Sequence, residues 1–304
     1  MGKLLAILFI FSCHICFAQT VLTDSSLLIK PGFNKGDVKI YLVNQKSTIE
    51  SSPLFPVKAE HDFKITFTII DTTSGYTIHY KADLLETTSK RYVSESVKAQ
   101  LIDGLSLTYK LNKDGWLIAL PDYRREQLRV IKKLDSIIGT DELKRDDKII
   151  VTMIRKNLQK NDGLETCLAP LLLFNDIFTK PVFRYHKDYH PMSIMNIFYQ
   201  PQIPGTAILE LQREKGQFSS SIVTLDFVAN RDSAAKYMEP RYHEAYYAIK
   251  GKPMKSSINE MKITHNREYD ISHPSGTPLS ISDKHVEFYL QRSVTKTTMK
   301  LLSE

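Results

Sequence analysis

Three side chains in the stretch RYHKDYH can bind a metal ion or transfer a proton. His186 and His190 are four residues apart with Asp188 between them, and His243 lies far downstream. On a helix, two histidines at this spacing would share a face and could both reach one zinc ion. The segment instead alternates like a strand and is followed by Pro191, and on a strand the two histidines lie about 13 Å apart. The pattern favours histidines on a sheet face or in a loop, so His186 and His190 are only weak candidates for a metal site.

Nucleophilic catalysis finds little support in the sequence. Cys167 lies in GLETCLAPLLLF, where apolar neighbours disfavour the reactive thiolate form. We therefore expect Cys167 to be a small buried hydrophobic residue. The chain has no Gly-x-Ser-x-Gly elbow and no phosphate-binding glycine loop. The neighbouring carboxylates Asp146 and Asp147 are expected on the polar face of a helix. The sequence thus predicts no catalytic residue and no cofactor.

Aromatic side chains are the main candidates for a binding surface. The late segment DSAAKYMEPRYHEAYYAIKG is rich in tyrosine, and the single tryptophan lies far upstream. A tyrosine ring is apolar while its hydroxyl can form hydrogen bonds, which suits a groove for a glycan or an acyl chain. The alternative is that these rings pack against a sheet as part of the core. The predicted ligand-binding residues are Trp116, Tyr237, Tyr242, Tyr246 and Tyr247.

The first twenty residues indicate export. Lys3 precedes an apolar run that is far shorter than the roughly 20 residues a membrane-spanning helix needs. Cys16 and Ala18 are small residues at the −3 and −1 positions of a cleavage site before Gln19. This pattern predicts a secretory signal peptide, residues 1–18, that is removed from the mature protein.

A lipoprotein signal is the alternative. Cys13 would then become the acylated first residue, but Phe11 stands where such signals have a small residue. Removal of the signal peptide would leave Cys167 as the last cysteine, which excludes an intramolecular disulfide. The remaining chain of about 286 residues is long enough to form a large core. We expect the mature protein in the periplasm or associated with the cell envelope.

The charge balance is moderately basic. The chain has a net charge of +7, which falls to +6 without Lys3, and the positive residues are spread along it. A basic surface favours anionic neighbours such as lipid headgroups or acidic glycans, although a solvated surface slightly richer in lysine explains the balance as well. No nucleic-acid recognition motif is present, so nucleic acid is not an expected partner.

Alternation of apolar and polar residues dominates the first third of the mature chain. In FKITFTII, the residues Phe63, Ile65, Phe67 and Ile69 face one side, and the alternation resumes after the turn DTTSG. Two alternating runs joined by a short glycine-containing turn predict a β-hairpin. The same pattern surrounds the turn NKDG. We therefore predict antiparallel strands within residues 36–120, with one face toward the core.

A helical period replaces this alternation over residues 121–178. Apolar residues recur at steps of three and four in the first predicted helix, residues 121–138. A second helix is predicted at about residues 142–160. A third, at about residues 164–178, is apolar enough to be buried on several sides, despite Pro170 inside it.

Strands and short helices are predicted over residues 181–304. TAILELQRE and SSSIVTLDFVA form a hairpin with a tight turn, and the tyrosine-rich stretch is predicted to be helical at both ends and broken at Pro240. No linker separates this block from the earlier strands. We therefore predict that residues 19–304 form a single α+β domain, in which helices cover the apolar face of a large, curved, half-barrel-like antiparallel sheet.

Two stretches carry a resemblance to known proteins. KGDVKIYL followed by FKITFTIIDTTSGYTI, and the late YDISHPSGTPLSI, are similar to a group of uncharacterised secreted β-rich proteins of Bacteroidetes. The resemblance rests on turn chemistry and implies no established activity. The plan of a sheet with helices is also similar to periplasmic lipoprotein carriers, whose half-barrels hold acyl chains between sheet and helices. That analogy concerns the fold alone.

Three functions follow as hypotheses. The first is a non-catalytic protein that binds or carries a lipid, an acyl chain or a glycan, or holds an envelope protein; it predicts an apolar pocket between sheet and helices. The second is a hydrolase of envelope glycans or peptides, which needs a histidine and a carboxylate within hydrogen-bond reach in a cleft. The third is a structural or assembly component of the envelope, which predicts an exposed apolar patch or sheet edge.

Overall fold

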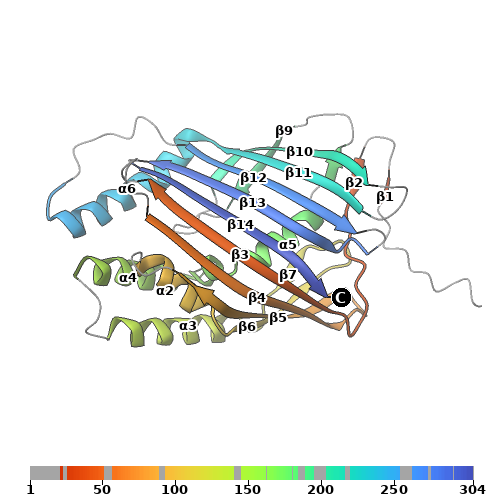
Figure 1. The fold of residues 1–304 in the computed structure, drawn as a ribbon, viewed down its shortest axis with the longest axis horizontal. Helices are drawn as coiled ribbons and strands as arrows, with labels where there is room; N and C mark the ends of the chain where they lie inside the picture. Colours follow the sequence, from red (N-terminus) through yellow and green to blue (C-terminus); the bar gives the residue numbers. More distant parts are fainter. Residues whose placement is uncertain are drawn as a thin grey trace, which may run out of the picture.

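In the structure, a computed structural model, one large sheet lies in front of a set of helices (Figure 1). The described residues are 21–22, 26–50, 57–88, 93–139, 145–161, 163–179, 181–183, 189–194, 203–215, 220–253, 262–272, 275–289 and 291–303. The predicted signal peptide, with Cys13 and Cys16, lies outside the described residues, so its cleavage stays a prediction.

The strands and helices follow one another in two β blocks separated by helices. The strands are β1 (Val21–Leu22), β2 (Ser26–Leu28), β3 (Val38–Glu50), β4 (Val57–Asp71), β5 (Tyr76–Thr87), β6 (Leu105–Leu111), β7 (Leu117–Ala119), β8 (Pro181–Phe183), β9 (Tyr189–Ile194), β10 (Ile203–Lys215), β11 (Ser220–Ala229), β12 (Lys262–Ser272), β13 (Pro278–Tyr289) and β14 (Gln291–Ser303). The helices are α2 (Val93–Ile102), α3 (Tyr123–Ile138), α4 (Arg145–Leu158), α5 (Ala169–Asp176) and α6 (Arg231–Lys250), with the short 3-10 helices η1 (Gly163–Cys167) and η2 (Ile177–Thr179).

The sheet joins the two ends of the chain. Its strand order is β1-β2-β8-β10-β11-β12-β13-β14-β3-β4-β5-β6-β7, with β9 paired to β10. The last strand, β14, pairs antiparallel with β3, and Met299 lies opposite Val43. This pairing makes one sheet of two meanders, β10–β14 and β3–β7. The predicted α+β class, with a large curved antiparallel sheet and helices on its apolar face, is confirmed.

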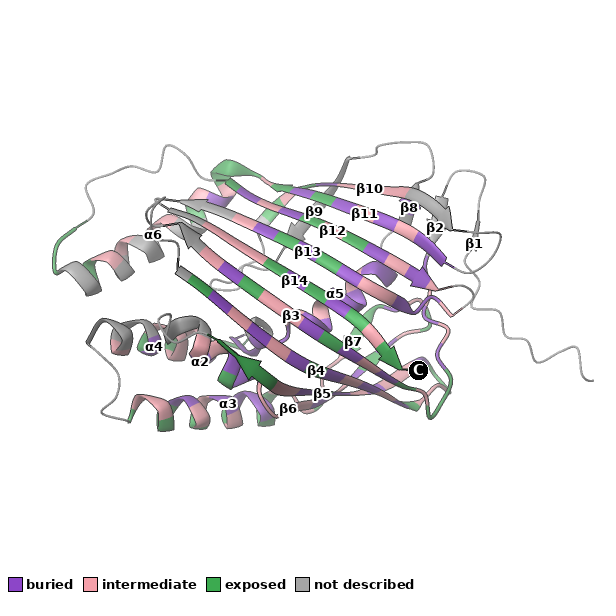
Figure 2. Cartoon of the chain, viewed as in Figure 1, coloured by how far each residue is buried: buried purple, intermediate pink, exposed green. Residues whose placement is uncertain are grey.

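The apolar positions of the strands face the helices, as their alternation predicts. Phe63, Ile65, Phe67 and Ile69 of β4 are all buried, while the residues between them are partly or fully exposed. Figure 2 shows this alternation as bands across neighbouring strands. The three predicted hairpins are present, since β4 pairs with β5, β6 pairs with β7, and β10 pairs with β11.

The helical region differs from the prediction in one internal detail. The third predicted helix is divided into η1, α5 and η2, and Pro170 lies in the first turn of α5. Proline is well tolerated there because the first N–H groups of a helix have no partner within the helix. A further helix, α2, lies between β5 and β6, inside the range for which only strands are predicted.

The predicted break at Pro240 is wrong, because α6 continues through it. Proline removes one backbone hydrogen bond from a helix, but both ends of α6 are capped. The Asn230 side chain accepts a hydrogen bond from the Ser233 N–H at 3.0 Å, and Gly251 ends the helix in the left-handed conformation, with φ +67°.

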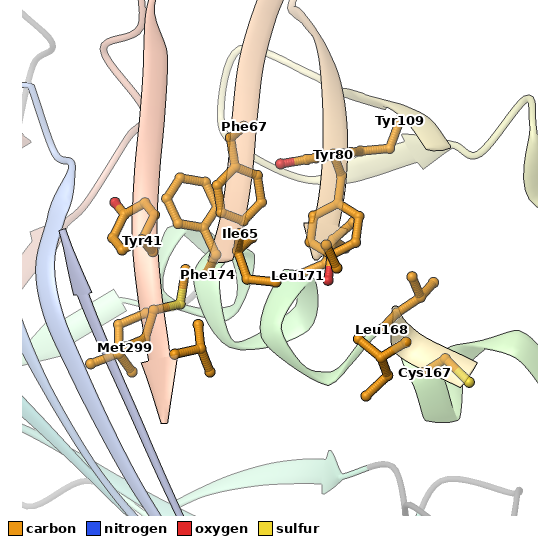
Figure 3. Packing of buried hydrophobic residues seen from close by; sticks show 14 of the residues in the cluster. Tyr41, Ile65, Phe67, Tyr80, Tyr109, Cys167, Leu168, Leu171, Phe174 and Met299 are labelled. Atoms are coloured by element: carbon orange, nitrogen blue, oxygen red, sulfur yellow. The ribbon is translucent and has the colours of Figure 1, made fainter. Parts of the chain in front are cut away.

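Aromatic rings fill the space between α5 and the strands β3 to β5. Phe174 of α5 stacks on Phe67 of β4 with ring centroids 4.1 Å apart, and the ring of Tyr41 in β3 packs against its edge. Figure 3 shows these rings together with Ile65 and Leu171. Burial of such large apolar side chains holds α5 against the sheet.

A crossing segment, residues 29–33, contacts turns at one end of the sheet. Gly32 donates a backbone hydrogen bond to Ser275 in the β12–β13 turn, at 2.9 Å. Lys30 forms an ion pair with Asp114 in the β6–β7 turn, with 2.6 Å between Nζ and Oδ1. The crossing segment therefore links turns from both meanders.

Candidate functional site

A buried polar network lies on the inward face of β12 and β13. His265 and Arg267 occupy inward positions of β12, between apolar neighbours. In the sheet register, His265 lies opposite His285, and Arg267 lies opposite Asp283. Polar groups on a face directed at the core must bond to one another to offset their burial.

These four side chains form a continuous series of hydrogen bonds. His285 Nδ1 lies 2.6 Å from His265 Nε2, and His265 Nδ1 lies 3.3 Å from Asp283 Oδ1. Arg267 Nε donates to the same carboxylate oxygen at 2.6 Å. A carboxylate can only accept, so His265 Nδ1 donates to it. In a neutral ring Nε2 then accepts from His285 Nδ1.

The charges within the network follow from burial. Burial, and after it His285, lowers the pKa of His265 to about 4, while Asp283 acts in the opposite direction. Burial on its own would raise the pKa of Asp283, but Arg267 and His265 outweigh it and hold that pKa below its usual value. His265 is therefore neutral near pH 7, and the charged partners are Arg267 and Asp283.

The network also fastens α5 to the sheet. Arg267 Nη1 lies 2.6 Å from Oδ2 of Asp176, the last residue of α5. Arg267 thus bridges one carboxylate on β13 and one on α5, and both ion pairs are largely shielded from solvent. Removing the guanidinium would leave two carboxylates without their cation.

The chemistry open to this network is limited by its burial. His265 uses both ring nitrogens within the protein, so it has none left to exchange a proton with a substrate. Within the described ranges, no group of three or more histidine, cysteine, aspartate or glutamate side chains could hold a metal ion. The arrangement is suited to holding elements together.

The structure describes two of the three histidines considered from the sequence. His186 lies outside the described residues, and His190 lies in β9 opposite Ala207. His243 lies in α6 with Nε2 3.7 Å from Oε1 of Glu239 in the same helix. The metal site and the hydrolase therefore stay predictions without a geometric basis among these residues. Cys167 is buried, as predicted.

The sequence pattern alone does not predict the histidine and carboxylate that do meet. The available signal was the position of charge within an alternating strand. In KITHNREYDI, His265 and Arg267 share a face with Ile263 and Tyr269, which places them toward the core. Their partners, His285 and Asp283, are set by the pairing register of β12 with β13, which the local pattern does not contain.

The predicted aromatic ligand residues lie at opposite ends of the strands. Tyr237, Tyr242, Tyr246 and Tyr247 lie in α6, which follows β11 at the left of Figure 1. That end of β11 is in register, through β12–β14, with Thr48 of β3, whereas Trp116 lies in the turn after β6, beyond the Val38 end. Ten residues of strand separate these two ends, about 33 Å. The five residues do not line one groove, and ligand contact by each of them stays a prediction.

Trp116 belongs instead to an exposed apolar patch on the edge of the sheet. Trp116, Leu117 and Ile118, here called the edge patch, are 53%, 42% and 60% exposed. They lie in and next to β7, which stands last in the sheet order and pairs with β6. Consecutive large apolar side chains left half exposed at a sheet edge are typical of a contact surface.

The turn before β7 fixes the position of the edge patch. Asn112 Oδ1 accepts hydrogen bonds from the backbone N–H of Asp114 at 3.0 Å and of Trp116 at 2.9 Å. Gly115 has φ +90°, and a Cβ there would overlap the side chain of Phe178. Only glycine accommodates both the dihedral angle and the contact, so the turn is tied to the core directly beneath Trp116.

Comparison with known proteins does not identify a family. No family model matches the sequence, and no curated protein matches it. One solved structure that matches is Ail, the attachment invasion locus protein of Yersinia pestis, with a TM-score of 0.18 and 8% identity over 88% of this chain and 99% of that one. A TM-score this low carries no argument about fold or function. The resemblance to Bacteroidetes proteins and to lipoprotein carriers therefore stays a prediction.

The described helices include no membrane-spanning candidate. None of them combines the length and the apolar character that a bilayer crossing requires.

Proposed function

We propose that this protein is an exported, non-catalytic assembly component of the cell envelope that binds a partner protein through the edge patch. The observation that carries the proposal is the run of three exposed apolar residues on the edge strand β7. Tryptophan is the residue type most enriched among the energetically dominant positions of interfaces. Export rests on the predicted signal peptide.

The charge around the edge patch indicates the chemistry of the partner. Lys110 of β6 lies opposite Ala119 of β7, Lys113 lies in the turn before β7, and both lysines are exposed. The nearby acid Asp114 is already paired with Lys30. The partner is therefore an apolar segment flanked by acidic residues. A second copy of this chain would bring like charges together, which disfavours a symmetric dimer through this patch.

Two features weigh against the other hypotheses. The space between α5 and strands β3–β5, where a carried acyl chain would be expected, is occupied by side chains such as Phe67 and Phe174. A hydrolase could use the hydrogen-bonded series of His285, His265 and Asp283. All three side chains are buried, however, so a substrate cannot reach them. Neither hypothesis accounts for the exposed edge patch.

Site-specific photo-crosslinking in intact cells tests the proposal. A photoreactive amino acid at Ile118 is expected to give one defined adduct with an acidic envelope protein. The matched control is Leu128 of α3, which is similarly exposed. Excess wild-type protein should compete for the adduct, and an Ile118→Glu variant should not. Equal adducts at both positions, a self-adduct of doubled mass, or no adduct at Ile118 would contradict the proposal.

A further inference from the structure

Three central strands present a basic strip on the side of the sheet that the helices leave uncovered. The basic strip comprises the outward-facing residues of β3, β13 and β14, which are adjacent in the sheet. Among the described side chains of these strands, the outward positions hold lysines, hydroxyl residues, Asn44 and aliphatic residues, and no carboxylate. The lysines are Lys46, Lys284, Lys296 and Lys300.

The lysines stand side by side across the strands. Lys284 lies opposite Lys296, and Lys296 lies opposite Lys46. Like charges directly opposite each other on adjacent strands destabilise a sheet. This row of lysines does not stabilise the sheet, so we look for its role in binding a partner.

The strands that flank the strip, β4 and β12, carry the outward acids Glu60, Asp62, Glu268 and Asp270. Glu60 pairs with Lys46 at 2.7 Å, and Asp62 Oδ1 accepts a hydrogen bond from Asn44 at 2.6 Å. Among the described residues, Lys284, Lys296 and Lys300 form no ion pair within 4.0 Å. Three exposed cations therefore remain available to an anionic partner.

We propose that the basic strip binds a bilayer surface rich in anionic phospholipid. Charge complementarity with headgroup phosphates is the first argument, since each lysine near such a surface strengthens binding. Exposed aliphatic side chains within the strip are the second: Leu42 lies opposite Lys300, and Leu302 follows Lys300 by two residues. Aliphatic side chains beside lysines suit the boundary between headgroups and acyl chains.

The composition of the strip favours a surface over a single phosphate ligand. The planar fork of arginine suits bidentate binding of a single phosphate, whereas every described cation of the strip is a lysine, which acts as a point charge. Lys296 and Lys300 are four residues apart on one strand, about 13 Å, too far to share one phosphate. Many headgroups on a surface satisfy such spread charges, and the edge patch on β7 stays accessible because it lies at the sheet margin.

Vesicle co-sedimentation of the purified mature protein tests this proposal. The probes are vesicles of phosphatidylcholine with phosphatidylglycerol and vesicles of phosphatidylcholine alone. The test variant is Lys284→Gln, Lys296→Gln, Lys300→Gln. The matched control is Lys132→Gln, Lys236→Gln, Lys252→Gln, which removes three exposed lysines outside the strip and changes the net charge equally. Circular dichroism checks that both variants are folded.

The proposal predicts binding to anionic vesicles only. Each strip lysine should contribute about fivefold to affinity, so the test variant should bind about 100-fold more weakly while the control binds like the wild type. Raising salt from about 0.1 M to about 1 M should abolish binding, because screening shortens from about 10 Å to about 3 Å. Equal loss in both variants, binding to neutral vesicles, or saturable competition by inorganic phosphate would each overturn the proposal. The result is independent of the edge patch.

Discussion

Acidification should destabilise this protein through one buried histidine. The pKa of His265 is lowered from 6.5 to about 4 by burial and by His285. The unfolded chain therefore binds a proton more strongly than the folded protein between these two pH values. The contribution of neutral His265 to the free energy of unfolding is present in full above pH 6.5 and is lost as the pH falls toward 4. Between pH 7 and pH 5, the linkage relation gives a loss of about 2 kcal/mol in the free energy of unfolding.

Urea denaturation of the mature protein at pH 7 and at pH 5 measures this loss. The control is His265→Gln, which can still donate to Asp283 but cannot take up a proton. Its free energy of unfolding at pH 7 should be lower than that of the wild type, because Gln does not fill the contact with His285. Its further loss between pH 7 and pH 5 should be smaller than that of the wild type by about 2 kcal/mol. Equal pH dependence in the two proteins would refute the reasoning.

Three substitutions test the interior, each by urea denaturation at pH 7. Arg267→Met should lower the free energy of unfolding by about 3–5 kcal/mol, because Asp176 and Asp283 lose their shared cation; a neutral result would mean that both carboxylates relax into solvent. Phe174→Ala should cost about 3–5 kcal/mol by opening a cavity beside Phe67, and a cost below about 1 kcal/mol would contradict the packing. Tyr80→Phe should be neutral or stabilising by about 1 kcal/mol, because the buried Tyr80 hydroxyl has no hydrogen-bond partner among the described residues; a clear loss of stability would point to a bonded hydroxyl.

Local patterns in the sequence predicted most of the elements. Strict alternation in β4 and β5 predicts a hairpin with one buried face. The pairing register is fixed because a one-residue slip would expose Phe63, Ile65 and Phe67. The apolar composition of the third helical segment predicts that it is buried, and Phe174 within it is fully buried. The sequence predicts these features because they depend on residues that are close together in the chain.

The features that were missed depend on pairing between distant segments. His265 meets His285 and Asp283 because β12 pairs with β13 in one register, and Arg267 meets Asp176 across 91 positions of sequence. The sequence predicts a groove shared by Trp116 and the tyrosines of α6, but the topology places them at opposite ends of the strands. No local pattern contains that information.

The edge patch contains the only tryptophan of the chain, which permits a direct test of the proposed function. The mature protein labelled with fluorotryptophan should give a single fluorine NMR resonance at the position of a solvent-exposed ring. On addition of detergent-solubilised envelope from its own cells, this resonance should shift or broaden, excess unlabelled wild-type protein should reverse the change, and the Ile118→Glu variant should show none. A resonance that stays unchanged in the presence of envelope would contradict the assignment of the edge patch as the partner-binding surface.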